Sequence, residues 1–186
     1  ETLVPEYTLP DPLVMEDGTP VTDSGMWTQH RRPELLRLFE EHVYGRSPGV
    51  PETVRYDVFD DTSDALGGAA IRRQVRILFW NNGHRHSADL LLYLPADADG
   101  PVPIFLGLNF YGNHTIWPDL DIRLSGGWMR DNDDFGVVNN RATEVSRGAA
   151  SKKWPVSRIL ERGYGLATLY YGDFDPDFDD GFQNGV

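Results

Sequence analysis

The stretch that decides the fold is Val102-Pro-Ile-Phe-Leu-Gly-Leu-Asn-Phe-Tyr-Gly-Asn-His-Thr115. Its first half, Ile104 to Phe110, is a nearly continuous apolar run, which predicts a strand that is buried on both faces in the middle of a sheet. The second half is polar and contains Gly112, so the strand leads into a loop at its carboxyl end. Ligands bind at that end of the strands in open α/β sheets. This loop is therefore the first candidate for a functional site.

Three more strands are predicted upstream, from Val54 to Asp60, from Ile71 to Trp80 and from Ser87 to Leu94. The last two are joined by a polar link that contains Asn82-Gly83, a pair typical of tight hairpins. We expect this hairpin to be antiparallel and to lead into the stretch around Ile104.

Two helices are predicted. The first begins at Pro33 and ends at Gly45, and the second runs from Trp154 to Arg162. Residues 1–32 are rich in Pro and Gly and predict an extended lead-in, while residues 117–151 predict a long excursion without a dominant period.

A second buried strand, Tyr164 to Tyr171, follows the second helix. A strand, a helix and a strand in this order predict a right-handed crossover in an α/β fold with a parallel sheet covered by helices. Two parallel apolar strands alone would leave an unprotected sheet edge, which native proteins avoid. We therefore expect residues 33–186 to be the N-terminal half of a larger α/β domain, incomplete without a C-terminal half in the same or a separate chain.

Composition limits the classes of partner. The chain has 186 residues, 40% of them hydrophobic, enough for one domain with a packed core. A net charge of −12 makes nucleic acid and anionic membranes poor partners, because both require a cationic surface. The absence of Cys excludes disulfides and thiolate metal sites. We expect no nucleic-acid partner, no membrane partner and no cofactor.

Several motifs have a plain structural interpretation. Gly45-Arg-Ser47-Pro-Gly49 matches the nucleophile elbow of hydrolases, but the elbow requires a strand before the Ser and a helix after it. Here a helix precedes the Ser, so the motif indicates a turn that ends this helix. His84 and His86 share a strand face, yet no carboxylate at a metal-site spacing supports them, which favours a solvated hairpin.

The loop after the central strand contains the better candidates for a functional site. They are Asn109, Tyr111, Asn113 and His114. His114 is either a functional residue or an ordinary loop His that orders Asn109 or Asn113 through a hydrogen bond. Asn113-His-Thr115 also matches the N-glycosylation motif, which has a meaning only in a eukaryotic secretory setting.

The acidic run from Asp173 to Gly181 departs from the spacing of a calcium-binding loop, because Asp180 stands before the Gly and no Glu closes the loop. A solvated loop is the favoured interpretation, with a calcium-dependent acidic module as a weaker alternative.

Five stretches together resemble one family, the glucuronoyl esterases of carbohydrate esterase family 15, above all its bacterial members. They occur in the expected order and are Leu9-Pro-Asp-Pro-Leu13, Arg32-Pro-Glu-Leu-Leu36 with Val43-Tyr-Gly-Arg46, Phe105 to Thr115, Arg147 to Val156, and Arg162 to Asp177. These esterases are α/β-hydrolases that cleave esters of glucuronic acid on xylan.

The resemblance implies a Ser-His-acid mechanism whose catalytic residues lie downstream of this chain, so none is assigned here. It places Asn109 to His114 at the loop that can contribute to an oxyanion hole or a cleft. It also implies a carbohydrate ester substrate, a secreted or periplasmic location, and no activity of this chain by itself. The alternative is a non-catalytic carbohydrate-binding or scaffold remnant of such an esterase, with Trp117, Trp128 and Trp154 near the cleft.

Overall fold

A computed structural model of the chain describes residues 4–47, 49–181 and 183. By their internal contacts the residues form two compact units, Glu1–Val50 and Pro51–Val186. The sequence predicts a boundary after residue 32 instead, so the division places the first predicted helix in the first unit. Whether the second unit is one half of a hydrolase domain stays a prediction.

The first unit contains a continuous helical segment. It consists of α1 (Ser24–Met26), the π-helical turn η1 (Trp27–Arg31), α2 (Arg32–Phe39) and a second π-helical turn, η2 (Glu40–Tyr44). The helix predicted from Pro33 is confirmed, and Gly45 ends it with a φ of 72°, which favours glycine. Ser47 lies beyond this helix, outside any regular element, so the helix precedes the Ser as predicted; Pro48 of the motif lies outside the described residues.

This helical segment begins earlier than predicted, inside the stretch expected to be extended. Asp23 caps its first turn by accepting a hydrogen bond of 2.8 Å from Met26 N. Arg31 is only 4% exposed, and its guanidinium donates to Pro12 O at 3.0 Å and pairs with Glu34 at 2.6 Å. The cap by Asp23 and the buried Arg31 therefore stabilise the start of the helical segment, where the sequence shows no helical repeat of apolar residues.

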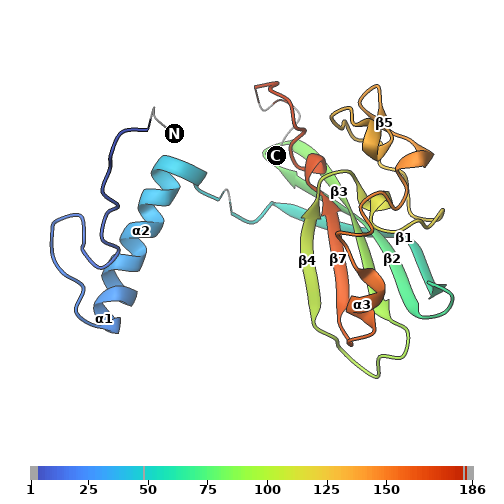
Figure 1. Ribbon diagram of the computed structural model, residues 1–186, viewed down its shortest axis with the longest axis horizontal. Coiled ribbons are helices and arrows are strands. Elements are labelled where there is room, and N and C mark those ends of the chain that lie inside the picture. Colours follow the sequence, from blue (N-terminus) through green and yellow to red (C-terminus); the bar gives the residue numbers. More distant parts are fainter. Residues whose placement is uncertain (1–3, 48, 182, 184–186) are drawn as a thin grey trace. The chain divides into compact units, whose positions relative to one another are not determined.

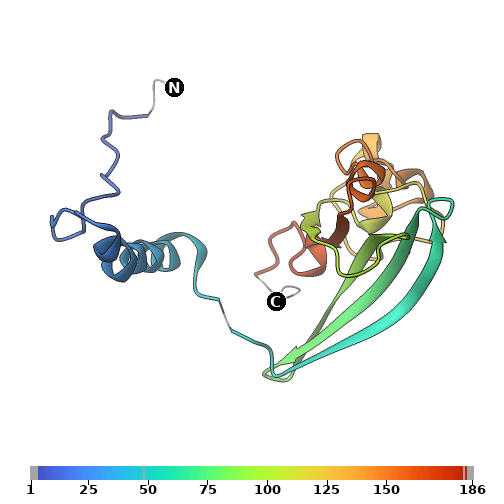
Figure 2. The ribbon, with the colours of Figure 1, turned by 90° about the horizontal axis from the view of Figure 1, so that it is seen from below.

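The second unit is built on a mixed sheet of five strands in the order β1-β2-β3-β7-β4 (Figure 1). The strands are β1 (Thr53–Ala65), β2 (Ala70–Asn81), β3 (His84–Pro95), β4 (Ile104–Asn109) and β7 (Gly165–Tyr170). The predicted strands are present, and the first three are longer than expected. Figure 2 shows β1, β2 and β3 as long, curved neighbours. Asn82 and Gly83, both with a positive φ, form the predicted hairpin turn between β2 and β3.

The prediction that the Ile104 strand lies in the middle of the sheet and is buried on both faces is wrong for the described chain. β4 is an edge strand that pairs, in parallel, only with β7. Its residues Ile104, Leu106 and Leu108 are 48%, 70% and 53% exposed. β7 instead is buried along its whole length, because the crossover inserts it between β3 and β4. The predicted unprotected edge is therefore present, and β4 forms it.

One face of the sheet carries the core. Helix α3 (Val156–Leu160) packs against β7 and β3, and Gly163 ends its last turn with a φ of 76°. Its Val156 and Leu160 join a cluster of buried side chains that also contains Leu91, Tyr93 and Leu166. The helix is shorter than the predicted one, because Pro155 is its N-cap and Glu161 its C-cap.

The long excursion contains short elements that no sequence period revealed. They are η4 (Asp133–Phe135), the hairpin of β5 (Val137–Val138) and β6 (Arg141–Ala142), and η5 (Glu144–Ser146). Two further short turns, η3 (Asn113–Thr115) and η6 (Tyr171–Asp173), follow β4 and β7. Met129, Val137 and Tyr170 form a second buried cluster beneath them. The excursion is therefore packed onto the carboxyl ends of β4 and β7.

Candidate functional site

The carboxyl ends of β4 and β7 lie side by side, because the two strands are parallel and Asn109 pairs with Tyr170. The chain leaves β4 into η3 and leaves β7 into η6, and the excursion packs next to both. Open α/β sheets bind ligands at this end. The structure thus places the predicted loop at the carboxyl ends of two parallel strands.

Asn109 is the anchor of this loop. It is 1% exposed, and its Nδ2 donates to Asn113 Oδ1 at 2.8 Å and to Thr168 Oγ1 at 3.0 Å. Asn113 in turn donates from Nδ2 to Asp89 O at 2.7 Å. This relay fixes both amides, and among the described residues it leaves Asn109 Oδ1 buried without a hydrogen-bond partner. A buried acceptor of this kind can receive a donor from another part of the protein or from a ligand.

His114 is completely buried and holds the excursion in place. Ser125 N donates to its Nδ1 at 3.4 Å, which leaves the proton on Nε2 to be donated to Ser146 Oγ, 2.8 Å away. Ser146 Oγ donates onward to Thr143 O at 2.5 Å. Burial lowers the pKa of His114 to about 4, and the nearby Arg147 acts in the same direction. His114 is therefore a neutral structural bridge, and it orders Ser146 rather than Asn109 or Asn113.

Tyr111 lies between the loop and the excursion. Its ring stacks on Phe135 with centroids 4.2 Å apart, and its hydroxyl accepts a hydrogen bond of 2.9 Å from Asn132 Nδ2. Asn109 and Tyr111 both line a cavity of about 310 Å³, whose other lining residues include Arg130, Lys153, Trp154, Tyr171 and Asp177. Two of the four predicted site residues therefore share one cavity.

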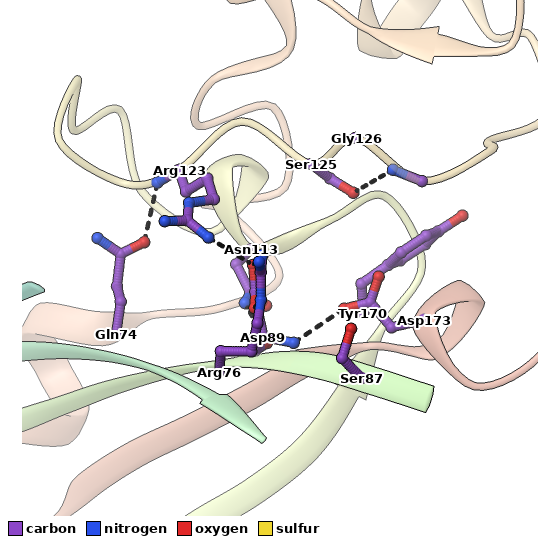
Figure 3. Close-up of a pocket in the computed structure, with 11 residues that line it drawn as sticks. Gln74, Arg76, Ser87, Asp89, Asn113, Arg123, Ser125, Gly126, Tyr170 and Asp173 are labelled. Carbon is purple, nitrogen blue, oxygen red and sulfur yellow. Dashed lines mark hydrogen bonds and ion pairs between the residues drawn. The ribbon is translucent and has the colours of Figure 1, made fainter. Parts of the chain in front are cut away.

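Asn113 lines a second cavity, of about 200 Å³, which Figure 3 shows beside β2 and β3. There Arg76 donates to both carboxylate oxygens of Asp89, at 2.7 and 2.9 Å, and Asp173 accepts a hydrogen bond of 3.1 Å from Asp89 N. Burial raises the pKa of the Asp173 carboxyl to about 6, although the bond from Asp89 N acts in the opposite direction. Arg123 lies 3.5 Å from Asp89 on the same side.

Sequence reasoning missed Asp89, Asp173 and Ser146 as members of this region. Asp89 occurs inside an apolar strand, which is a usable signal, because a carboxylate in such a run requires a partner. Asp173 stands at the start of an acidic run, which by itself indicates only a solvated loop. Nothing in the sequence links Ser146 to His114, because the two residues meet only through the fold of the excursion.

The remaining motifs do not converge on metal or nucleophilic chemistry. His86 is hydrogen-bonded through Nε2 to Asp173 O, and His84 is exposed in the hairpin. No group of three or more His, Cys, Asp or Glu residues in the described part of the chain could hold a metal ion. The sequon residues Asn113, His114 and Thr115 are all buried.

Nucleophilic ester hydrolysis requires an accessible nucleophile activated by an oriented base. Among residues 4–47, 49–181 and 183, the single Ser hydroxyl that is hydrogen-bonded to a His ring is that of Ser146, bonded to His114, and both residues are fully buried. The site as described offers cavity walls, charges and hydrogen-bond donors instead.

Comparison with known proteins connects this arrangement to one family. No protein-family model matches the chain. A carbohydrate esterase named MZ0003, from an unknown prokaryotic organism, is 51% identical over 179 residues, which are 96% of this chain and 41% of that protein. A solved structure of a promiscuous CE15 esterase from a marine bacterial metagenome is 48% identical with a TM-score of 0.84. The chain resembles the CE15 glucuronoyl esterases.

The likeness extends across the two units and over less than half of each relative. The CE15 esterase from the marine metagenome matches 95% of this chain with 44% of its own. A glucuronoyl esterase from Solibacter usitatus is 45% identical with a TM-score of 0.87, and it matches the whole of this chain with 46% of its own. The mixed sheet with few helices therefore corresponds to part of the α/β-hydrolase-like fold of the CE15 family.

Proposed function

We propose that this chain is the N-terminal portion of a carbohydrate esterase that hydrolyses esters of glucuronic acid. The observation that carries the proposal is the identity of 45–48% with CE15 esterases, together with TM-scores of 0.84 and 0.87, over 44–46% of their length. The nucleophile, base and acid come, on this proposal, from the remaining part of the esterase. The loop from Asn109 to His114 contributes the wall of the cleft.

The exposed edge of β4 supports this division. Within the described chain, the backbone of β4 pairs with another strand on one side only. The apolar side chains of Leu106 and Leu108 are exposed. An edge strand of this kind is a template for the pairing of a further strand. A C-terminal half that adds a strand beside β4 would cover it.

The test measures hydrolysis of a small glucuronic acid ester by two proteins. One is this chain alone, and the other is this chain joined to the remaining part of the Solibacter usitatus esterase. We expect no hydrolysis by the chain alone and hydrolysis by the joined protein. Hydrolysis by the chain alone, or a folded joined protein without activity, contradicts the proposal. Binding of xylan fragments by an inactive joined protein would favour the alternative, a carbohydrate-binding remnant.

A further inference from the structure

The sheet has a second free edge at β1, on the side opposite to β4. Within the described chain β1 pairs only with β2, and Figure 2 shows it as the outermost of the long, curved strands. A free edge carries unpaired backbone N–H and C=O groups, which can pair with another strand. A strand added beside β4 would leave the outer side of β1 uncovered, so what β1 binds is independent of the proposed function.

The two halves of β1 differ in how well they are protected against pairing. The second half contains two register shifts, which occur after Val58 and after Thr62. Bulges of this kind twist an edge away from a partner. The first half, residues 53–58, pairs with β2 without a shift, and all of its residues are exposed. An incoming strand can therefore pair with residues 53–58 of β1 and is obstructed beyond them.

One face of residues 53–58 is apolar. Val54, Tyr56 and Val58 share this face, because side chains alternate along a strand. All three are exposed, and Tyr56 is 70% exposed. β-Branched and aromatic side chains stabilise a sheet by packing against residues directly across from them on a neighbouring strand. β2 provides such neighbours on one side only, and the outer side offers the same side chains to a second strand.

The opposite face of this stretch carries one charge of each sign, Arg55 and Asp57. Both residues are exposed, and the guanidinium of Arg55 lies over the Trp80 ring at 5.7 Å. Neither residue takes part in an ion pair within the described part of the chain. Both charges are therefore available to a strand that presents the opposite charge in the same register.

A second copy of residues 53–58 presents these charges when the two copies of β1 run antiparallel about a twofold axis at Tyr56. Arg55 of each copy then lies opposite the partner's Asp57, and Val54 lies opposite the partner's Val58. If the axis moves to Arg55 or to Asp57, that residue faces its own copy, and parallel pairing in register also sets like charges against each other. Opposite charges directly across a strand pair stabilise it, whereas like charges destabilise it.

We propose that this protein forms a homodimer in which the β1 edges of two copies pair antiparallel over residues 53–58. The two sheets become continuous through this contact, which is a form of strand addition. The interface is isologous, because the same residues are contributed by both copies. The self-complementary order of Arg55, Tyr56 and Asp57 identifies the partner as a second copy of the chain.

The first test is sedimentation of the 186-residue chain over a range of concentrations. We expect a monomer–dimer equilibrium. Arg55→Asp sets carboxylates against each other and Asp57→Arg sets guanidinium groups against each other, so each should raise the dimer dissociation constant by about tenfold. The double variant Arg55→Asp/Asp57→Arg restores opposite charges, and its dissociation constant should return to within about threefold of the wild-type value.

This exchange of charges separates pairing of β1 from other kinds of association. Association through the β4 edge would be insensitive to all three variants, and a general loss of folding would not be reversed in the double variant. A monomeric wild-type chain, single variants that dimerise as well as the wild type, or a double variant as weak as the single variants would overturn the proposal.

The second test uses the absence of Cys from the chain. Tyr56→Cys places two thiols across the twofold axis, where the Cβ atoms of directly opposite residues are about 4.5–5.5 Å apart, close enough for a disulfide after a small adjustment. We expect oxidation of a dilute sample to give a covalent dimer. Ser63→Cys is the matched control, because Ser63 is exposed on β1 within the second register shift. Equal yields of covalent dimer from the two variants, or none from Tyr56→Cys, would contradict the pairing.

Discussion

At the scale of single residues, burial decides which polar groups in this protein are free to take part in chemistry. His114 and Ser146 form a pair with the spacing of a catalytic dyad, at 2.8 Å, but each is 0% exposed. The Ser146 proton is directed to Thr143 O. The pair is therefore a structural link between the loop after β4 and the excursion.

The buried His114 gives the first prediction. Its folded-state pKa of about 4 lies below the ordinary value of 6.5, so the native state binds fewer protons than the unfolded chain between these values. Stability should be lost as pH falls from 6.5 towards 4, by up to about 3 kcal/mol. His114→Gln should remove this component in urea unfolding at pH 7 and pH 4.5, while His84→Gln in the exposed hairpin should not. An unaltered pH dependence in His114→Gln contradicts the prediction.

Asp173 gives a second prediction with the opposite sign. Its pKa of about 6 is raised above 3.8, so its contribution to stability is complete at low pH and is lost as pH rises from 3.8 to 6. Asp173→Asn keeps an acceptor for Asp89 N and removes the charge. We expect the variant to be more stable than wild type by about 1–2 kcal/mol at pH 7 and equal to it near pH 4. Thermal unfolding at pH 7 and pH 4 measures the difference in stability, and Asp99→Asn, at an exposed residue, is the control. If Asp173→Asn is less stable than wild type at pH 7, the prediction is wrong.

Sequence reasoning found the loop of the candidate site but could not divide its residues among the cavities. Asn109, Tyr111, Asn113 and His114 are neighbours in the chain, yet the turn at Gly112, with a φ of 89°, sends them in different directions. Two line one cavity, one lines the other, and His114 is enclosed. Which cavity each side chain lines depends on backbone turns and on hydrogen-bond partners that are distant in sequence. Thr168, the partner of Asn109, lies 59 residues away.

At the scale of elements, the apolar runs predicted strands correctly and their positions in the sheet incorrectly. β4 and β7 are both apolar, and a continuous apolar run predicts only that both faces of a strand are buried. It does not predict which strands lie on either side of it. Which strand lies between its neighbours depends on the crossover through α3. The short elements between residues 117 and 151 escaped prediction because side-chain hydrogen bonds, such as that of Asn132 to Phe135 N, define them instead of an apolar period.

The third prediction tests how β4 packs against the layer that contains α3. A Cβ atom on Gly107 would lie 3.0 Å from Trp154 Cη2, which is tighter than an ordinary contact. Gly107→Ala should therefore destabilise the protein by about 1–3 kcal/mol through overpacking. Gly100→Ala is the matched control, because a Cβ atom there meets nothing within 4 Å. Equal midpoints of urea denaturation for the two variants would contradict the prediction, because they would show that the Trp154 ring moves aside without a loss of stability.

At the scale of the whole molecule, the proposed function makes the exposed edge of β4 an interface. The fourth prediction concerns Leu106, which is 70% exposed. Leu106→Asp should reduce self-association of the chain alone and lower the activity and stability of the protein joined to its C-terminal half, because a charge would then be buried. Leu120→Asp, at a loop residue that is 79% exposed, is the control. Light scattering measures the self-association of the chain alone, and the melting temperature measures the stability of the joined protein. If Leu106→Asp lowers the melting temperature of the joined protein no more than Leu120→Asp does, the interface is contradicted.

The insertion of β7 between β3 and β4 also determines the order in which the sheet can assemble. β3 can pair with β2 as soon as the hairpin at Asn82 has left the ribosome, since this contact is local in sequence. β4 has no partner until Gly165–Tyr170 has been synthesised. The apolar β4 therefore stays unpaired while the whole excursion is translated, and an exposed apolar strand without a partner makes a chain prone to aggregate. Mutations that slow docking of β7 should therefore reduce the yield of soluble protein more than their effect on native stability predicts.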